Sequence, residues 1–190
     1  MTTLTLSPIK TAKLDLERIE QQFRGAEPKK ILAWCVENMP TGLVFHSTFS
    51  IDDLVITDIL YRVMEVENRI PVIFIDTLHH FPETLALVET AKKIYNLDLR
   101  VYKVEGLAQK DVLNFTKTEL LQELNAQAWI TGNCRNNEQV FSPDEKGRLQ
   151  INPLAYWRRV ESWAYAYEYD LIYNPLYDEG YSEIGPQLSI

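Results

Sequence analysis

The alternation of continuous apolar runs with amphipathic segments is the feature that most constrains how this chain can fold. Two runs, at 43–45 and 71–75, are apolar throughout, which is typical of strands buried on both faces of a sheet. Further strands are predicted at 97–102, 128–131 and 149–152, and helical spacing of apolar residues at 14–23, 31–35, 52–63, 82–94, 116–125 and 160–169. This order predicts an α/β fold, with a twisted sheet of about five strands, parallel in its core, and helices on both faces.

The length of the chain fits one domain. Its 190 residues can bury a sizeable core but are too few for two ordinary domains. We therefore predict a single domain over 1–190. It comprises a helical N-terminal segment (1–41), an α/β core (42–155) and a C-terminal helix with an aromatic tail (156–190).

Charge and composition exclude several classes of function. With 19 Lys and Arg against 27 Asp and Glu, the net charge is −8, so we expect neither nucleic-acid nor membrane-surface binding. We find neither a signal peptide nor an apolar run of membrane-spanning length, and expect a cytoplasmic protein. The two cysteines, Cys35 and Cys134, exclude four-cysteine metal or iron–sulfur ligation within these residues.

Three segments follow predicted strands directly and carry polar residues: 46–53, 76–80 and 132–139. Ligands of open parallel sheets bind beyond the carboxyl ends of the strands. The fold would therefore bring these segments, which are far apart in sequence, to one edge of the sheet.

The first segment offers hydroxyls and backbone N–H groups at the start of a helix. Ser47, Thr48 and Ser50 can cradle phosphate or sulfate oxygens there, helped by the positive helix end. The alternative is a well-capped helix and no ligand. The segment has no glycine, and Asp52 and Asp53 would repel an anion that came close.

The second segment combines an acid with two histidines. Asp76 can accept a hydrogen bond from an adenine amino group or a ribose hydroxyl. A metal site is not expected, because the adjacent side chains of His79 and His80 would seldom face one ion. We interpret His80 as a polar wall or a proton donor.

The third segment begins at Gly132, which ends a predicted strand. Arg135 can pair with a phosphate or sulfate in a fork geometry. Cys134, next to Arg135, can have a lowered pKa and act as a nucleophile, although a lone free cysteine is more often an inert packing residue.

Aromatic residues are dense near the C-terminus. They are Trp157, Trp163, Tyr165, Tyr167, Tyr169, Tyr173, Tyr177 and Tyr181. Base stacking is one interpretation, and a final helix packed on the sheet by aromatic side chains is the favoured alternative. An exposed aromatic tail would also suit a homodimer.

Several ordered motifs together resemble the phosphoadenosine phosphosulfate (PAPS) reductase family. Its fold is similar to that of the ATP pyrophosphatases, which belong to the adenine nucleotide alpha hydrolase-like proteins. Residues 74–84 (FIDTLHHFPET) resemble the nucleotide-site signature of the family, most closely in its fungal form. Residues 124–132, 149–154 and 173–185 resemble the strand before the arginine loop and the closing segment, and 46–53 stand at the modified pyrophosphate loop.

The resemblance implies thiol-dependent reduction of an activated sulfate. In the family a C-terminal cysteine attacks the sulfur of the sulfonucleotide, and thioredoxin then releases sulfite. Carried over, Ser47, Thr48 and Ser50 would hold the phosphosulfate end of the nucleotide. Asp76, Thr77 and Leu78 would hold the nucleoside, and Arg135 the anionic group, with His80 and Gly132 beside them. The core 42–155 would thus bind an adenine sulfonucleotide or an ATP-like ligand.

Departures from the family pattern leave two functions open. The sequence given has no Glu-Cys-Gly motif near Ile190, lacks the paired cysteines that bind an iron–sulfur cluster in one branch, and carries Cys134 and Arg135 where consecutive basic residues are usual. We expect no iron–sulfur cluster and no other bound cofactor. Either the protein is a reductase or related sulfur-transfer enzyme, with Cys134 as its thiol, or it is an adenine-nucleotide-binding relative, such as a pseudoenzyme or an ATP-dependent adenylating enzyme.

Overall fold

A computed structural model describes residues 15–104, 110–132 and 139–186 of the chain, and the side chains of all of these except residues 110–112. Cys134 and Arg135, singled out above, lie outside the described residues.

The described residues form one six-stranded sheet with the order β3-β2-β1-β4-β6-β5. The strands are β1 (Leu43–His46), β2 (Val72–Asp76), β3 (Leu99–Lys103), β4 (Ala128–Thr131), β5 (Phe141–Pro143) and β6 (Leu149–Ile151). All neighbouring strands pair in parallel except β5, which is antiparallel to β6. The predicted α/β class with a parallel core is confirmed.

The sheet has one strand more than the five predicted. The additional strand, β5, is only three residues long and ends in Pro143, so it shows no apolar run that the sequence could reveal. It lies at the edge of the sheet, where a proline that donates no hydrogen bond is tolerated. A tight turn with Gly147 at φ 76° connects it to β6.

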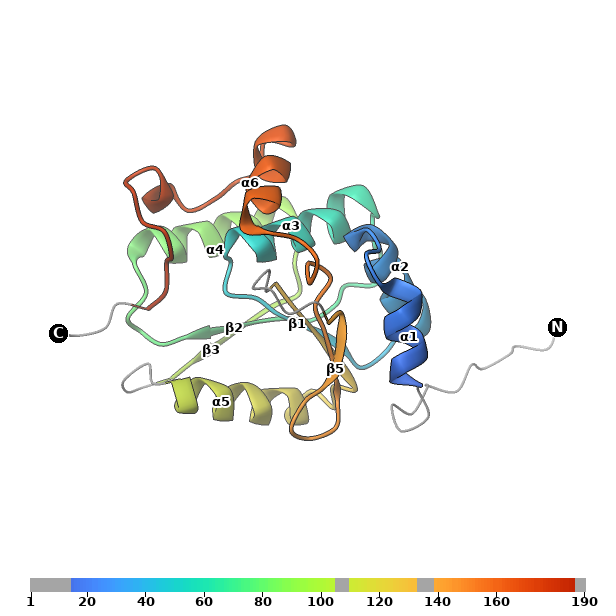
Figure 1. The fold of residues 1–190 in the computed structure, drawn as a ribbon. Helices are drawn as coiled ribbons and strands as arrows, with labels where there is room; N and C mark the ends of the chain where they lie inside the picture. Colours follow the sequence, from blue (N-terminus) through green and yellow to red (C-terminus); the bar gives the residue numbers. More distant parts are fainter. Residues whose placement is uncertain (1–14, 105–109, 133–138, 187–190) are drawn as a thin grey trace.

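Helices cover both faces of the sheet. Helices α3 (Ile51–Asp58), α4 (Pro82–Ile94) and α6 (Arg159–Glu168) lie on one face, and α5 (Lys110–Glu123) lies on the other (Figure 1). The core is divided accordingly, because successive strand residues point to opposite faces. Phe45 and Phe74 belong to the larger cluster, whereas Val44, Ile73 and Trp129 pack with Leu121 of α5.

Each predicted helical segment corresponds to a helix of the structure, although the first and last residues differ in most cases. Helices α1 (Leu16–Phe23) and α2 (Pro28–Asn38) precede the sheet, and α3 continues into a π-helical turn, η2 (Ile59–Val63). Helix α5 begins at Lys110, six residues before the predicted 116–125. The prediction missed the first turn and a half of this helix, although Leu113 continues the spacing of Leu120 and Leu121.

The aromatic residues of the C-terminal region pack mainly on one another. The ring of Trp163 lies 5.2 Å from that of Tyr173 and 5.0 Å from that of Tyr177, centroid to centroid. Trp163 and Tyr165 also pack against the larger core cluster. This arrangement fits the interpretation of a helix packed by aromatic side chains. The short 3₁₀ turn η3 (Pro175–Tyr177) closes the region.

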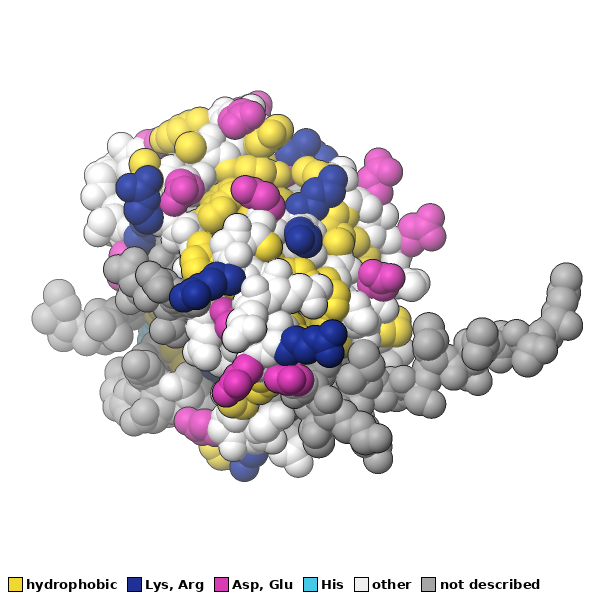
Figure 2. Space-filling view, turned by 45° about the vertical axis from the view of Figure 1, so that its right-hand side comes forward, with side chains coloured by type: hydrophobic (Ala, Val, Ile, Leu, Met, Phe, Trp, Pro, Cys, Tyr) yellow, Lys and Arg dark blue, Asp and Glu magenta, His cyan; other side chains and the backbone are white. Residues whose placement is uncertain are grey.

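One side of the molecule shows hydrophobic side chains gathered in its upper part, with acidic and basic side chains among them (Figure 2). None of the described helices has the length and apolar character needed to cross a membrane.

Candidate functional site

A cavity of about 200 Å³ lies beyond the carboxyl ends of β1 and β2. Four of the predicted site residues line it: Ser47, Thr48, Thr77 and His80. The remaining lining residues come from β1, β2, α4, α5 and the C-terminal segment, and are His46, Phe74, Ile75, Thr84, Leu113, Asn114, Lys117, Ile184, Gly185 and Pro186. Two of the three predicted segments therefore meet at one cavity, as the position of ligands in open α/β sheets predicts.

The loop between β1 and α3 is held by its own side chains. The hydroxyl of buried Ser47 accepts a hydrogen bond from Phe49 N at 3.0 Å, which supports the left-handed backbone of Phe49 at φ 57°. Ser50 caps α3, its hydroxyl accepting from Asp53 N at 3.3 Å. These two hydrogen bonds support the turn of the loop.

The Asp53 carboxylate fills the inside of this loop. One oxygen, Oδ2, accepts hydrogen bonds from Thr48 N and Thr48 Oγ1, both at 2.8 Å, and from Ser50 Oγ at 3.2 Å. Burial raises the pKa of Asp53 to about 6, against the hydrogen bonds from Thr48 and Ser50, which lower it. Donors that the sequence assigned to a phosphate or sulfate therefore point at a carboxylate of the chain itself.

The other oxygen of Asp53 reaches the end of β4. Gly132 N donates to Asp53 Oδ1 at 3.0 Å, across 79 positions of sequence. A Cβ at position 132 would lie 2.4 Å from that oxygen and 2.8 Å from Asp53 N, so only glycine fits there. Asp53 thus joins the first predicted segment to the beginning of the third.

The loop between β2 and α4 contains a second tight turn. Asp76 Oδ1 accepts from Leu78 N at 2.8 Å, and Leu78 has a left-handed backbone with φ 62° and an exposed side chain. The ring of His80 lies 3.2 Å from the carbonyl oxygen of Ile75 and packs on Phe74. The structure therefore places Thr77 and His80 at the cavity, with Asp76 buried in the turn beside it.

Helix α5 supplies a cation that the sequence analysis did not select. Lys117 is half-buried, lines the cavity, and has its Nζ 4.4 Å from the centroid of the Trp129 ring. Burial, followed by the charge of Lys117, lowers the pKa of His46 to about 4, so His46 is neutral at pH 7. The rule that ligands bind beyond the strand ends does not select Lys117, because this residue lies on a helix between two strands. A lysine on such a helix is usually a solvated surface residue.

The C-terminal segment closes one side of the cavity. Asn174 Nδ2 donates to Thr84 Oγ1 of α4 at 2.9 Å, and both residues are buried. This bond ties the segment to α4 ahead of the three lining residues 184–186. The sequence analysis identified the motif 173–185, but it did not predict that this segment lies at the cavity.

Among the described residues, neither Cys35 nor the acidic side chains form a second reactive or metal-binding site. Cys35 is fully buried in α2, and burial raises its pKa well above the usual range, which makes it a packing residue. Within the described ranges, no group of three or more His, Cys, Asp or Glu side chains is arranged to hold a metal ion.

The fold and the cavity define an α/β protein with a site at the carboxyl edge of a parallel sheet. The model of the phosphoadenosine phosphosulfate reductase domain matches residues 42–189. A PAPS reductase of Emericella nidulans is 32% identical over 209 residues, covering 95% of this chain and 68% of that protein. One of Gloeobacter violaceus is 32% identical over 195 residues, covering 90% and 80%. The chain belongs to the phosphoadenosine phosphosulfate reductase family.

Solved structures agree with this assignment. A PAPS reductase of Candida auris, solved as a phosphate complex, superposes with a TM-score of 0.76 at 26% identity, covering 99% of this chain and 100% of that one. The FMN adenylyltransferase of Candida glabrata, in complex with FAD and pyrophosphate, has a TM-score of 0.67 at 16% identity, with 88% of this chain and 62% of that one covered. The second likeness concerns the fold alone.

Proposed function

We propose that the cavity binds an adenine sulfonucleotide and that the protein is a PAPS reductase, which releases sulfite and adenosine 3′,5′-bisphosphate. One observation carries the proposal. Two segments that resemble the nucleotide-site motifs of the family, 46–53 and 74–84, line one cavity at the edge of the sheet where ligands of this fold bind.

The lining of the cavity suits a nucleotide. Phe74, Ile75 and Leu113 give the cavity apolar lining against which a purine can pack. The hydroxyls of Ser47, Thr48 and Thr77 supply hydrogen-bonding groups for the sugar and its substituents. His80 lines the same cavity and offers a ring nitrogen.

The covalent step requires a reactive thiolate. It would attack the sulfur of the sulfonucleotide and break the bond to the bridging oxygen, releasing adenosine 3′,5′-bisphosphate and leaving a thiosulfonate on the protein. A dithiol such as thioredoxin would then free sulfite and be oxidised to its disulfide. We propose Cys134 for this thiolate, because it stands next to Arg135 just past a strand end, whereas Cys35 is buried and unreactive.

The electrons in this scheme come from the dithiol, so the proposal includes neither a metal ion nor an iron–sulfur cluster. It includes thioredoxin as the partner and a cytoplasmic setting, where thiols are kept reduced.

Two measurements test the proposed function. Calorimetric titration with adenosine 3′,5′-bisphosphate should show binding, and incubation with PAPS and reduced thioredoxin should release sulfite. Cys134→Ser should abolish sulfite release and leave nucleotide binding intact, whereas the control Cys35→Ser should retain both. Binding without sulfite release would favour a nucleotide-binding relative without reductase chemistry. Absence of binding would contradict the proposal.

A further inference from the structure

We propose that an anionic group of the nucleotide binds beside Lys117, on the α5 wall of the cavity, and not inside the β1–α3 loop. This inference rests on the proposed function, and it names the residue that makes the cavity selective for phosphorylated over neutral nucleosides. Two independent observations carry it: the loop already holds an anion of the chain, and the opposite wall presents a cation without an acidic partner.

The hydrogen-bond donors of the β1–α3 loop already bind a carboxylate, which leaves few of them for an anionic ligand. The donors Thr48 N, Thr48 Oγ1 and Ser50 Oγ all point at one oxygen of Asp53, and Gly132 N points at the other. A phosphate or sulfate at the same position would displace this carboxylate or lie against it. Like charges at such a distance repel strongly in a buried site.

Among the described residues that line the cavity, Lys117 is the only lysine or arginine. Its Nζ lies 4.4 Å from the centroid of the Trp129 ring, and within the described part of the chain no ion pair joins Lys117 to an acid. Burial penalises the charged ammonium and lowers the pKa of Lys117. An anionic ligand group would supply the missing partner.

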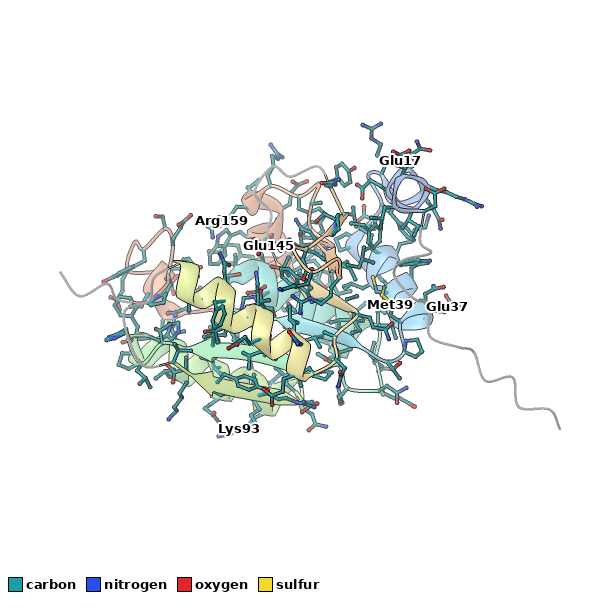
Figure 3. The ribbon with its side chains drawn as sticks, turned by 90° about the horizontal axis from the view of Figure 1, so that it is seen from below. Glu17, Glu37, Met39, Lys93, Glu145 and Arg159 are labelled. Carbon is teal, nitrogen blue, oxygen red and sulfur yellow. The ribbon has the colours of Figure 1, made fainter. Side chains whose placement is uncertain are left out.

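The groups around Lys117 do not neutralise it. Asp144, on the turn after β5, is bound to Arg148 Nε at 2.7 Å and accepts further bonds from the backbone N–H groups of Lys146 and Arg148. His46, which faces the same cavity, is neutral at pH 7. The charges of Asp144 and of Glu145, which lies near α5 (Figure 3), raise the pKa of Lys117, but burial, the largest influence, and the charge of Arg148 lower it.

Position supports the same assignment. Lys117 lies on α5, which crosses the sheet on the face opposite α3 and α4 (Figure 3). The cavity reaches from the β1–α3 loop to Leu113, Asn114 and Lys117 on this helix. A nucleotide whose base packs on the apolar lining can therefore direct a phosphate or sulfate group toward α5 without entering the loop.

The test compares two ligands that differ in charge. Calorimetric titrations with adenosine 3′,5′-bisphosphate and with adenosine are made on the wild type, Lys117→Met and Lys117→Arg. Lys93→Met serves as a matched control, because Lys93 lies near the exposed end of α4, away from the cavity (Figure 3). Thermal melts of each variant show that it is folded, and Lys117→Gln replaces Lys117→Met if the latter is not.

We expect Lys117→Met to weaken binding of the bisphosphate about tenfold or more, the range of one charge-assisted contact. Adenosine should bind with unchanged affinity, Lys117→Arg should recover most of the loss, and Lys93→Met should match the wild type. Equal losses for both ligands, or no loss for the bisphosphate, would overturn the role of Lys117 while leaving the proposed function standing. A wild type that binds neither ligand would contradict both.

Discussion

Asp53 is the residue whose role in the structure differs most from the role predicted from the sequence. The sequence indicated only that Asp53 would repel an anion near the helix start. The structure shows its carboxylate as the acceptor that organises the loop, bound to Thr48, Ser50 and Gly132. Whether a carboxylate repels a ligand or stands in its place depends on side-chain direction, which sequence spacing does not contain.

The ionisation of Asp53 predicts a pH dependence of stability. Its pKa is raised from 3.8 to about 6 in the folded protein, mainly by burial. The stabilising contribution is therefore complete below the unfolded pKa and is lost as pH rises through the folded one. We expect the free energy of unfolding of the wild type, relative to Asp53→Asn, to fall by about 3 kcal/mol between roughly pH 3 and pH 7.

Urea denaturation of both proteins across this pH range measures the difference. Glu89→Gln, at an exposed position of α4, serves as the control for general charge effects, because Asp52 itself raises the pKa of Asp53. A difference between wild type and Asp53→Asn that stays constant or grows with pH would show that the hydrogen bonds outweigh burial.

Gly132 predicts a second effect at the scale of a single residue. An alanine there would bring its Cβ to 2.4 Å from Asp53 Oδ1 and 2.8 Å from Asp53 N, so the end of β4 must move away from α3. We expect Gly132→Ala to lower the free energy of unfolding by about 1–3 kcal/mol, the range for overpacking. Gly185→Ala, where no atom lies within 4 Å of the added Cβ, should change it little. Equal stability of both variants would contradict the close approach of β4 and α3.

At the scale of elements, a buried carboxylate joins three helical segments. Asp58, at the end of α3, accepts from Arg62 Nε and Nη2, both at 2.5 Å, from Tyr95 Oη at 3.3 Å and from Tyr165 Oη of α6 at 2.8 Å. The partners satisfy the charge of a fully buried group. This cluster fixes α6 and the end of α4 to the π-helical turn.

Tyr165→Phe tests this connection between helices. Removing the hydroxyl deprives Asp58 of one donor, and we expect a loss of about 1–2 kcal/mol in the free energy of unfolding. Tyr167→Phe is the matched control, because Tyr167 lies on the same helix with 67% of its side-chain surface exposed. Chemical denaturation distinguishes the two. If Tyr167→Phe is as harmful as Tyr165→Phe, the bond to Asp58 contributes nothing specific.

Strands and helices with a clear apolar pattern could be predicted from the sequence, and those with a weak pattern could not. The segments 43–45 and 128–131 predicted β1 and β4 to within one residue, because the first three residues of each strand are apolar and buried. Strand β5 is stabilised by pairing with β6 and carries no such run. The position of Lys117 at the cavity could not be predicted either, because it depends on how α5 packs across the sheet.

At the scale of the whole molecule, the order of elements determined the fold and the place of the site. The rule that ligands bind at the carboxyl edge brought 46–53 and 76–80 to one cavity, and Asp53 links the loop to Gly132. Residues 133–138 of the third segment lie outside the described residues. The roles of Cys134 and Arg135 therefore stay predictions.

Exposed apolar side chains on and after α6 support a homodimer as a further prediction. Val160, Tyr167 and Tyr181 expose 60%, 67% and 43% of their surface. We expect light scattering to give twice the mass of the 22.1 kDa chain, and Val160→Asp with Tyr167→Asp to lower it toward that of one chain. A wild type with the mass of a single chain would contradict this prediction.

The central claim is that an adenine nucleotide binds in the cavity between the β1–α3 loop and α5. A crystal structure of the protein with adenosine 3′,5′-bisphosphate tests it most directly. We expect the base against Phe74 and Ile75, a phosphate within hydrogen-bonding reach of Lys117 Nζ, and the Asp53 carboxylate still bound to Thr48. A nucleotide located elsewhere on the protein would contradict the claim, and a phosphate inside the loop with Asp53 displaced would contradict the assignment of the anion to Lys117.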